Sequence, residues 1–125
     1  MEKKFFKRYS NIRINYKLWM SSESGKEILD DAKWQMLISI HQMGSLKAAA
    51  DKENISYRKA WGDVIKMENI LGFHLVEKHR GGKTGGLTIL TDEGKRLVEA
   101  YVDFRAEFQN NVNETIRRFK KTLKQ

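Results

Sequence analysis

The sequence predicts a mainly α-helical protein with a small β component, an α+β fold. Four stretches of the chain carry apolar residues at spacings of three and four, the pattern of a helix with one buried face. Shorter stretches alternate apolar with polar residues or adjoin glycines, which predicts short antiparallel strands. With 125 residues, 40% of them hydrophobic, the chain is long enough to form one modest core.

The chain is strongly basic. It has 24 Lys and Arg residues against 16 Asp and Glu, a net charge of +8 and a pI of about 9.7. This excess favours a polyanionic partner, with nucleic acid first and an anionic membrane surface second. There is no cysteine, which excludes disulfides and cysteine-ligated zinc.

The N-terminus is expected to form a basic tail over residues 1–11. Its sequence, MEKKFFKRYSN, lacks the apolar h-region of a signal peptide. No apolar run in the sequence is long enough to cross a membrane. We therefore expect a cytoplasmic protein with no membrane partner.

A pair of short strands is predicted next. The segment IRINYKLWM (12–20) alternates apolar and polar residues, which predicts a half-buried strand. Residues 21–26 form a turn, and EIL (27–29) is a short return strand. The apolar face of the first strand comprises Ile12, Ile14, Tyr16 and Leu18.

Two helices follow, each with its own start signal. The first covers residues 30–44, with Asp30 or Asp31 as its N-cap and Gly44 as its C-terminal stop. Ser45 then caps the second helix. The residues at helical spacing are Trp34, Leu37, Ile38 and His41 or Ile40 in the first helix, and Leu46, Ala49 and Ala50 in the second.

KENI (52–55) interrupts the helical pattern, and a third helix follows over about residues 56–71. Ser56 is its N-cap and Gly72 ends it. Its buried stripe is expected to contain Ala60, Val64, Met67 and Leu71.

A glycine-rich hairpin and a long helix complete the chain. HLVEKHR (74–80) and LTILT (87–91) are predicted strands, joined by the flexible tip GGKTGG (81–86). Thr91 caps the final helix, which we expect to run over residues 92–125.

The final helix has one long apolar seam. A helix of this length extends beyond what a small domain can cover, so we expect a second copy of the chain to pack against it. The predicted dimerisation residues are Leu97, Tyr101, Phe104, Phe108, Val112 and Ile116.

The order helix, helix, tight turn, helix, β-hairpin is that of a winged helix-turn-helix. We assign it to residues 12–91, with the recognition helix at about 56–71 and the wing at about 74–91. In this motif the N-terminal part of the recognition helix faces base edges in the major groove of DNA. The predicted function is therefore a sequence-specific transcription regulator that binds double-stranded DNA as a homodimer, on a pseudo-palindromic operator.

Cations and aromatics at the start of the recognition helix are the candidate readers. Arg58 can present a bidentate fork to guanine, and Tyr57 is the second candidate for base readout. Trp61 could contact DNA or pack against a neighbouring element. The full set of predicted DNA-binding residues is Ser45, Ser56, Tyr57, Arg58, Lys59, Trp61, Lys66, Arg80, Lys83 and Thr84.

Other functions find less support. The GKT tripeptide in the hairpin tip lacks the earlier glycine that a phosphate-binding P-loop requires. Three histidines, His41, His74 and His79, occur without cysteine, so no metal site is expected. No nucleophile lies at a recognisable spacing from a base, so we expect no enzyme. The alternative that stays open is a dimeric interaction module, whose basic C-terminal helix binds a protein or a membrane surface.

The stretch from Gly44 to Gly94 resembles the N-terminal DNA-binding domain of the ModE family, the molybdate-responsive transcription regulators. It is also similar, more distantly, to the LysR-type DNA-binding domain. The resemblance covers roughly residues 12–105. The matching pieces are Gly44-Ser45-Leu46, Ala48-Ala49-Ala50, Ser56-Tyr57-Arg58, Ala60-Trp61, Leu71-Gly72, Leu75-Val76-Glu77, Gly81-Gly82, Gly85-Gly86, Leu90-Thr91 and Gly94.

The resemblance implies a winged helix on an operator, dimerisation through the helices that flank the domain, and control of transcription. It implies groove-facing roles for Ser56, Tyr57, Arg58 and Lys59, and wing contacts for Arg80 and Lys83. Full-length ModE proteins carry molybdate-binding domains after the winged helix, whereas this chain ends at Gln125. We therefore expect neither molybdate nor another oxyanion to bind this chain, and no cofactor.

Overall fold

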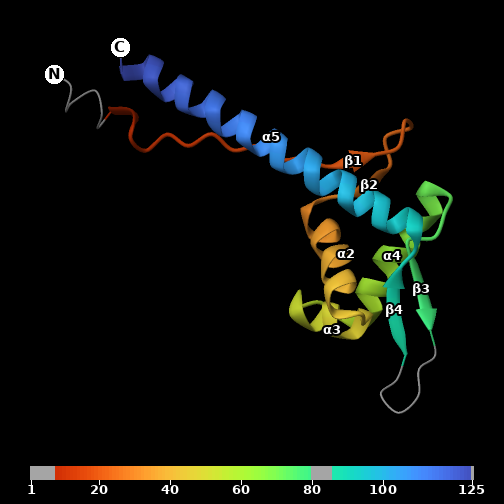
Figure 1. The fold of residues 1–125 in the computed structure, drawn as a ribbon. Helices are drawn as coiled ribbons and strands as arrows, with labels where there is room; N and C mark the ends of the chain where they lie inside the picture. Colours follow the sequence, from red (N-terminus) through yellow and green to blue (C-terminus); the bar gives the residue numbers. More distant parts are fainter. Residues whose placement is uncertain (1–7, 80–85, 125) are drawn as a thin grey trace. The chain divides into compact units, whose positions relative to one another are not determined.

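The computed structural model describes residues 8–79 and 86–124 (Figure 1). The chain divides into two compact units, one formed by Leu18–Ala100 and the other by the N-terminal 17 residues together with Tyr101–Gln125. The mainly α fold with a small β component is confirmed. Its elements are β1 (Met20–Ser21), β2 (Glu27–Leu29), α2 (Asp31–Met43), α3 (Leu46–Lys52), α4 (Tyr57–Leu71), β3 (Val76–His79), β4 (Leu87–Leu90) and α5 (Asp92–Lys124).

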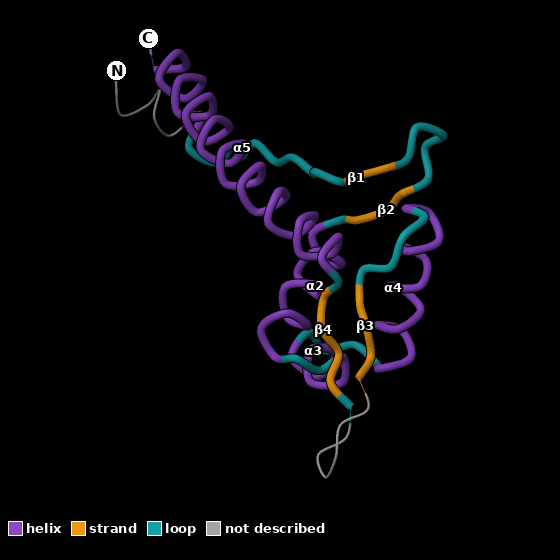
Figure 2. The backbone as a smooth tube through the Cα atoms, turned by 45° about the vertical axis from the view of Figure 1, so that its right-hand side comes forward, coloured by secondary structure: helices purple, strands orange, loops and turns teal. Residues whose placement is uncertain are grey.

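The first unit contains two small antiparallel sheets. β1 pairs with β2, with Met20 opposite Leu29 and an irregularity at the next residue. β3 pairs with β4 in regular register from Val76–Leu90 to His79–Leu87, and Figure 2 shows these two strands side by side. The short return strand over residues 27–29 and the two hairpin strands predicted from the sequence are confirmed.

The three short helices begin and end where the sequence predicts. The side chains of Asp30, Ser45 and Ser56 each accept a hydrogen bond from the backbone N–H three residues later, at 3.0, 3.1 and 3.0 Å. Each bond satisfies one of the N–H groups that a helix start leaves without an intrahelical partner. Gly44 and Gly72 end α2 and α4 with φ angles of 67° and 82°, a left-handed conformation that glycine adopts without steric cost.

The core lies between α2, α3, α4 and the two sheets. Leu37, Ile40, Leu46 and Val64 are fully buried there. The small buried residues Ala49, Ala50 and Ala60 allow α3 and α4 to pack closely. On the predicted stripe of α4, Leu71 is only half-buried.

The inward face of α2 differs from the prediction. Met36, Leu37, Ser39 and Ile40 are buried, whereas Trp34 and Ile38 are half-buried and His41 is exposed. The helix is thus rotated toward Met36 and Ile40, because α2 packs against α3, β4 and β2 and has to cover all three.

The predicted strand over residues 12–20 is largely wrong. Only Met20 and Ser21 pair in a sheet, and the preceding residues form irregular chain. The alternation of apolar residues has another cause, because these side chains pack on a helix. A helix uses its own backbone groups internally, so it offers no hydrogen-bond ladder to a neighbouring segment.

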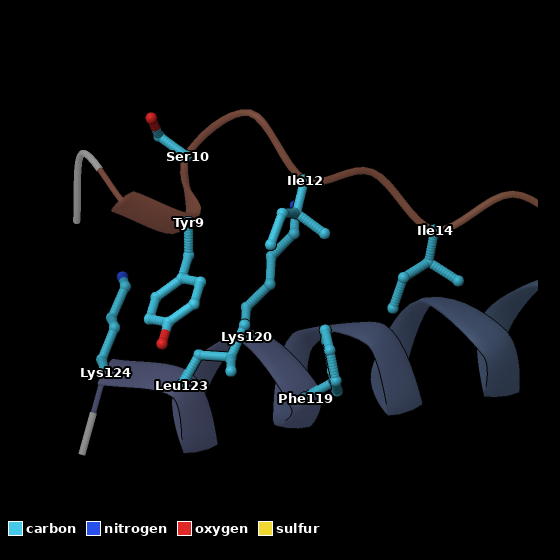
Figure 3. Close-up of a pocket in the computed structure, with 8 residues that line it drawn as sticks. All are labelled: Tyr9, Ser10, Ile12, Ile14, Phe119, Lys120, Leu123 and Lys124. Carbon is cyan, nitrogen blue, oxygen red and sulfur yellow. The ribbon is translucent and has the colours of Figure 1, made fainter. Parts of the chain in front are cut away.

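In the second unit, the N-terminal segment runs along the C-terminal half of α5 (Figure 1). Tyr9, Ile12 and Ile14 face Phe119 and Leu123 across a pocket of about 200 Å³ (Figure 3). The ring of Tyr16 packs 5.8 Å from that of Phe108, centroid to centroid. The part of the predicted tail that is described therefore packs on α5, and the apolar seam of α5 is partly covered within one chain.

A tight junction joins the end of the hairpin to the start of α5. The backbone N–H of Thr91 donates to the carbonyl of Leu75 at 2.9 Å, and the Thr91 hydroxyl donates to the carbonyl of His74 at 2.7 Å. The same hydroxyl oxygen accepts from the N–H of Gly94 at 2.9 Å, which confirms Thr91 as the N-cap. A Cβ on Gly94 would lie 2.3 Å from the Leu75 carbonyl oxygen, so only glycine fits.

We expect Gly94→Ala to lower the free energy of unfolding by about 1–3 kcal/mol, because the added carbon overpacks a backbone contact. Urea unfolding monitored by circular dichroism measures the change. Gly62→Ala is the matched control, since a Cβ there meets nothing within 4 Å. That change should stabilise the protein by about 1 kcal/mol through helix propensity alone. Equal effects of the two changes would contradict the described junction.

Candidate nucleic-acid interface

The outward face of α4 is the centre of the candidate site. Ala60, Val64 and Met67 are buried. Because the helix has about 3.6 residues per turn, four other residues lie on its opposite side, the first of them at the second position of the helix. These residues, all exposed, are Arg58, Gly62, Ile65 and Asn69.

Gly62 leaves this face open at its middle. A Cβ at this position would have no heavy atom within 4 Å, so packing inside the chain does not require glycine here. Glycine in a helix interior costs about 1 kcal/mol relative to alanine. Its position on the exposed face lets another molecule approach the helix backbone closely.

A hydrogen bond from α2 stabilises the turn between α3 and α4. The buried hydroxyl of Ser39 donates to the carboxylate of Glu53 at 2.9 Å. Within the turn, Asn54 has a φ of 57°, the left-handed conformation that asparagine tolerates better than most residues. These contacts set the direction in which α4 leaves the turn.

The hairpin is attached to the helices at both of its strands. The carboxylate of Glu68 on α4 accepts from the N–H groups of Leu75 and Val76 at 2.7 and 3.3 Å, just where β3 begins. On the other strand, the N–H of Thr88 donates to the carbonyl of Gly44 at 2.9 Å, between α2 and α3. The position of the hairpin relative to α4 is therefore defined by hydrogen bonds.

One flank of α4 faces β3 and carries the aromatics. The ammonium group of Lys78 donates to the hydroxyl of Tyr57 at 2.8 Å. It also lies 4.1 Å from the centre of the Trp61 ring, in cation–π geometry. Trp61 is half-buried, so it packs against the hairpin lysine on this side of the helix.

The other flank carries Lys59 and Lys66. Lys59 forms an ion pair with Asp63, one turn along the helix, at 3.0 Å. Lys66 is exposed. Since an exposed pair of this kind is worth only about 0.3–0.5 kcal/mol, Lys59 can exchange Asp63 for another anion at little cost.

Comparison with known proteins agrees with this geometry. Residues 32–95 match the model of the bacterial regulatory helix-turn-helix proteins of the lysR family. The chain belongs to this family.

Two curated relatives extend the match. The molybdenum transport protein ModE of Azotobacter vinelandii is 37% identical over 82 residues, which are 66% of this chain and 30% of that protein. The DNA-binding transcriptional dual regulator ModE of Escherichia coli K12 is 33% identical over 91 residues, 73% of this chain and 34% of the relative. The predicted resemblance to both families is confirmed. The chain spans about a third of the length of these relatives.

A solved structure has the same fold. The complex of BenM_DBD with benA site 1 DNA superposes with a TM-score of 0.56 at 21% identity, and covers 71% of this chain and 94% of that one. In this lysR-family chain, the matched residues include α3, the turn after it, α4 and the hairpin β3–β4 that follows.

The predicted site residues fall into distinct groups within this lysR-family fold. Tyr57, Arg58, Lys59, Trp61 and Lys66 lie together on α4. Ser45 and Ser56 cap their helices and each accepts one hydrogen bond there, so their O–H groups remain available as donors to a ligand. The predicted wing contacts lie outside the described residues; they are Arg80, Lys83 and Thr84.

Lys78 is the residue that sequence reasoning missed. It is the one lysine of β3 and follows the buried Val76 by two positions, so both side chains lie on the same face of the strand. That period of two was the available signal, because it places the exposed Lys78 on the face of β3 that meets α4.

The predicted dimerisation residues differ in exposure. Tyr101 is already buried in the single chain at 5% exposure, whereas Phe104 is 51% exposed. The rings of Tyr101, Phe104 and Phe108 form a series with centroid separations of 6.3 and 5.9 Å. The remaining residues of the predicted seam are half-buried: Leu97, Phe108, Val112 and Ile116.

Two of the three histidines lie next to carboxylates. His74 is 3.5 Å from Glu68 and His79 is 3.4 Å from Glu77. Across residues 8–79 and 86–124, no three potential ligands are grouped to hold a metal ion. In the same part of the chain, no helix has the length and apolarity needed to span a membrane.

We expect Glu68→Gln to lower the free energy of unfolding by about 1.5–3 kcal/mol, because a charged acceptor of two backbone N–H groups is lost. Chemical denaturation measures this value. The matched control is Glu77→Gln, which alters an exposed pair on β3 and should change stability by less than about 0.5 kcal/mol. A silent Glu68 variant would show that this carboxylate does not hold the hairpin.

Proposed function

We propose that this chain is a sequence-specific transcription regulator that binds double-stranded DNA. The observation that carries the proposal is the outward face of α4. There an exposed arginine in the first turn is followed by a glycine with open space above it. The helix is joined to the hairpin by Glu68, and the turn before it is held by Ser39. This face suits insertion into a major groove, where an arginine fork matches guanine.

The relatives support the same proposal. The Escherichia coli relative is named a DNA-binding transcriptional dual regulator, and the BenM domain was solved bound to DNA. The net charge of +8 favours a polyanionic partner. The proposed place of action is the cytoplasm, and the chain would act by binding alone, without catalysis. Molybdate binding is not part of the proposal.

We further propose that the chain acts as a homodimer through α5. Phe104, Phe119 and the overlying Ile14 remain 51%, 43% and 41% exposed in the single chain. Large apolar side chains gathered on one surface favour association. A two-fold dimer would present two copies of α4 to half-sites of a pseudo-palindromic operator, about one helical turn of DNA apart.

Selection from a random duplex library, at two salt concentrations, tests the proposed function. A two-fold symmetric motif should be enriched, and affinity should fall steeply with salt because phosphate contacts release counterions. Salt-sensitive binding without a motif would leave only a non-specific DNA binder. Absence of binding at both concentrations would contradict the proposal and favour the interaction-module alternative.

In the same assay, Arg58→Ala should weaken binding to the selected site by about 1–3 kcal/mol and relax one base position, because the guanidinium fork is lost. Lys26→Ala is the matched control. It removes one positive charge from the exposed turn between β1 and β2. Within the unit Leu18–Ala100, this turn lies at the end away from α3 (Figures 1 and 2). An unchanged motif in the Arg58 variant would remove this residue from base readout.

For the dimer, Phe104→Asp should raise the dimer dissociation constant by about thirtyfold, since central aromatic residues contribute about 2 kcal/mol or more to interfaces. Analytical ultracentrifugation measures the constant. Asn110→Asp introduces the same charge on the opposite side of α5 and should leave it unchanged. A Phe104 variant that dimerises like the wild type would contradict the proposed seam.

A further inference from the structure

The contact between Tyr57 and Lys78 leaves a specific pair of donors at the surface. Lysine can only donate, so the Tyr57 oxygen is the acceptor in their 2.8 Å hydrogen bond. The phenolic hydrogen then remains as a donor, and within the described part of the chain no acceptor binds it. The ammonium group has further N–H donors. Both side chains are exposed, so the two donors are available to a ligand.

Lys78 keeps its positive charge uncompensated by a nearby carboxylate in the described structure. The acidic residues of α4 and β3 make other contacts. Asp63 pairs with Lys59, Glu77 with His79, and Glu68 with the backbone at the start of β3. The ammonium group of Lys78 lies over the face of the Trp61 ring. This cation–π contact positions the charge without neutralising it.

The direction of Tyr57 differs from that of Arg58. Successive residues on a helix are about 100° apart, which follows from 3.6 residues per turn. Arg58 belongs to the outward face with Gly62, whereas Tyr57 lies on the flank that meets β3. If the outward face enters a major groove, that flank meets the sugar-phosphate strand at the groove edge.

We propose that Tyr57 and Lys78 together bind one backbone phosphate of the DNA, and that Tyr57 does not read a base. The proposal rests on the proposed function. A phosphate is anionic and only accepts hydrogen bonds, which matches a hydroxyl donor next to an ammonium. The start of α4 adds the positive end of its helix dipole. The Lys78 hydrogen bond polarises the phenol and strengthens it as a donor.

In this arrangement Trp61 is a positioning residue that acts through Lys78. It explains how a tryptophan at the start of a recognition helix contributes without touching a base. The site also couples the two DNA-facing elements, because one phosphate is held by α4 and β3 at once.

The test combines variants with DNA in which single phosphates are replaced by neutral methylphosphonates, on a duplex selected by the wild-type protein. Tyr57→Phe should weaken binding about tenfold on every duplex and leave the selected motif unchanged, since a hydrogen bond to a charged group is lost. Lys78→Ala should flatten the dependence of log affinity on log salt by about 0.9, the contribution of one phosphate. Lys78→Arg should restore that slope.

The decisive readout is coupling to one phosphate. Replacing one particular phosphate by a methylphosphonate should lower the affinity of the wild type. The same replacement should lower the affinity of the Tyr57→Phe and Lys78→Ala variants only a little further, because they have already lost the contact with that phosphate. The control is Lys66→Ala, which removes an exposed cation on the other flank of α4. Its effect on affinity and the effect of that methylphosphonate should add in full. Thermal unfolding of each variant shows whether it retains the wild-type fold.

A changed base preference in Tyr57→Phe would overturn the phosphate assignment and leave the proposed function intact. Additive effects at every methylphosphonate position would also overturn it. If the wild type selects no duplex at all, the proposed function fails and this inference fails with it.

Discussion

The backbone of Leu75 is the point on which the arrangement of the candidate site depends. Its N–H donates to the carboxylate of Glu68 on α4, and its carbonyl accepts from Thr91 at the start of α5. Gly94 packs directly against the same carbonyl. Because the side chain of Leu75 is also fully buried, one residue joins α4, the hairpin and α5. Both backbone groups of Leu75 are hydrogen-bonded, so moving α4 or α5 away from the hairpin would leave a polar group of this buried residue unpaired.

This junction explains how a small domain can place side chains for recognition. Base readout needs donors whose positions are set before binding, since ordering a long side chain on binding costs conformational entropy. Lys78 lies only two residues after the Glu68 attachment at Val76, and it reaches Tyr57 and Trp61 on α4. The candidate interface is therefore a single surface built by α4 and β3; we propose that the outward face of α4 contacts bases and that the shared flank contacts the DNA backbone.

Much of the fold could be predicted because local signals agreed with one another. Caps at Ser45 and Ser56, stops at Gly44 and Gly72, and the buried stripe of α4 all follow from residues close in sequence. The segment over residues 12–20 could not be predicted correctly, because alternating apolar and polar residues indicate only that one side of the segment is buried. This pattern does not distinguish a neighbouring strand from the helix α5 that covers it. In the same way, the inward face of α2 depends on three neighbouring elements that its own sequence does not specify.

The candidate site was predictable residue by residue on α4 but not as a constellation. Arg58 and Tyr57 are recognisable from their place in the helix, yet their different directions follow only from where β3 lies. Lys78 lies 21 residues after Tyr57 in the sequence, so their contact depends on tertiary structure. The ion pair between Lys59 and Asp63 is a local pair that spacing alone could have indicated.

The most direct measurement of the central claim is an NMR titration of the isotope-labelled protein with a selected duplex. The account predicts that the largest shift changes occur at the amides of Arg58, Gly62 and Asn69 and at the indole N–H of Trp61. Confinement of the changes to the basic end of α5, around Lys120 and Lys124, would contradict it. That result would mean that the α4 face is not the DNA-binding surface.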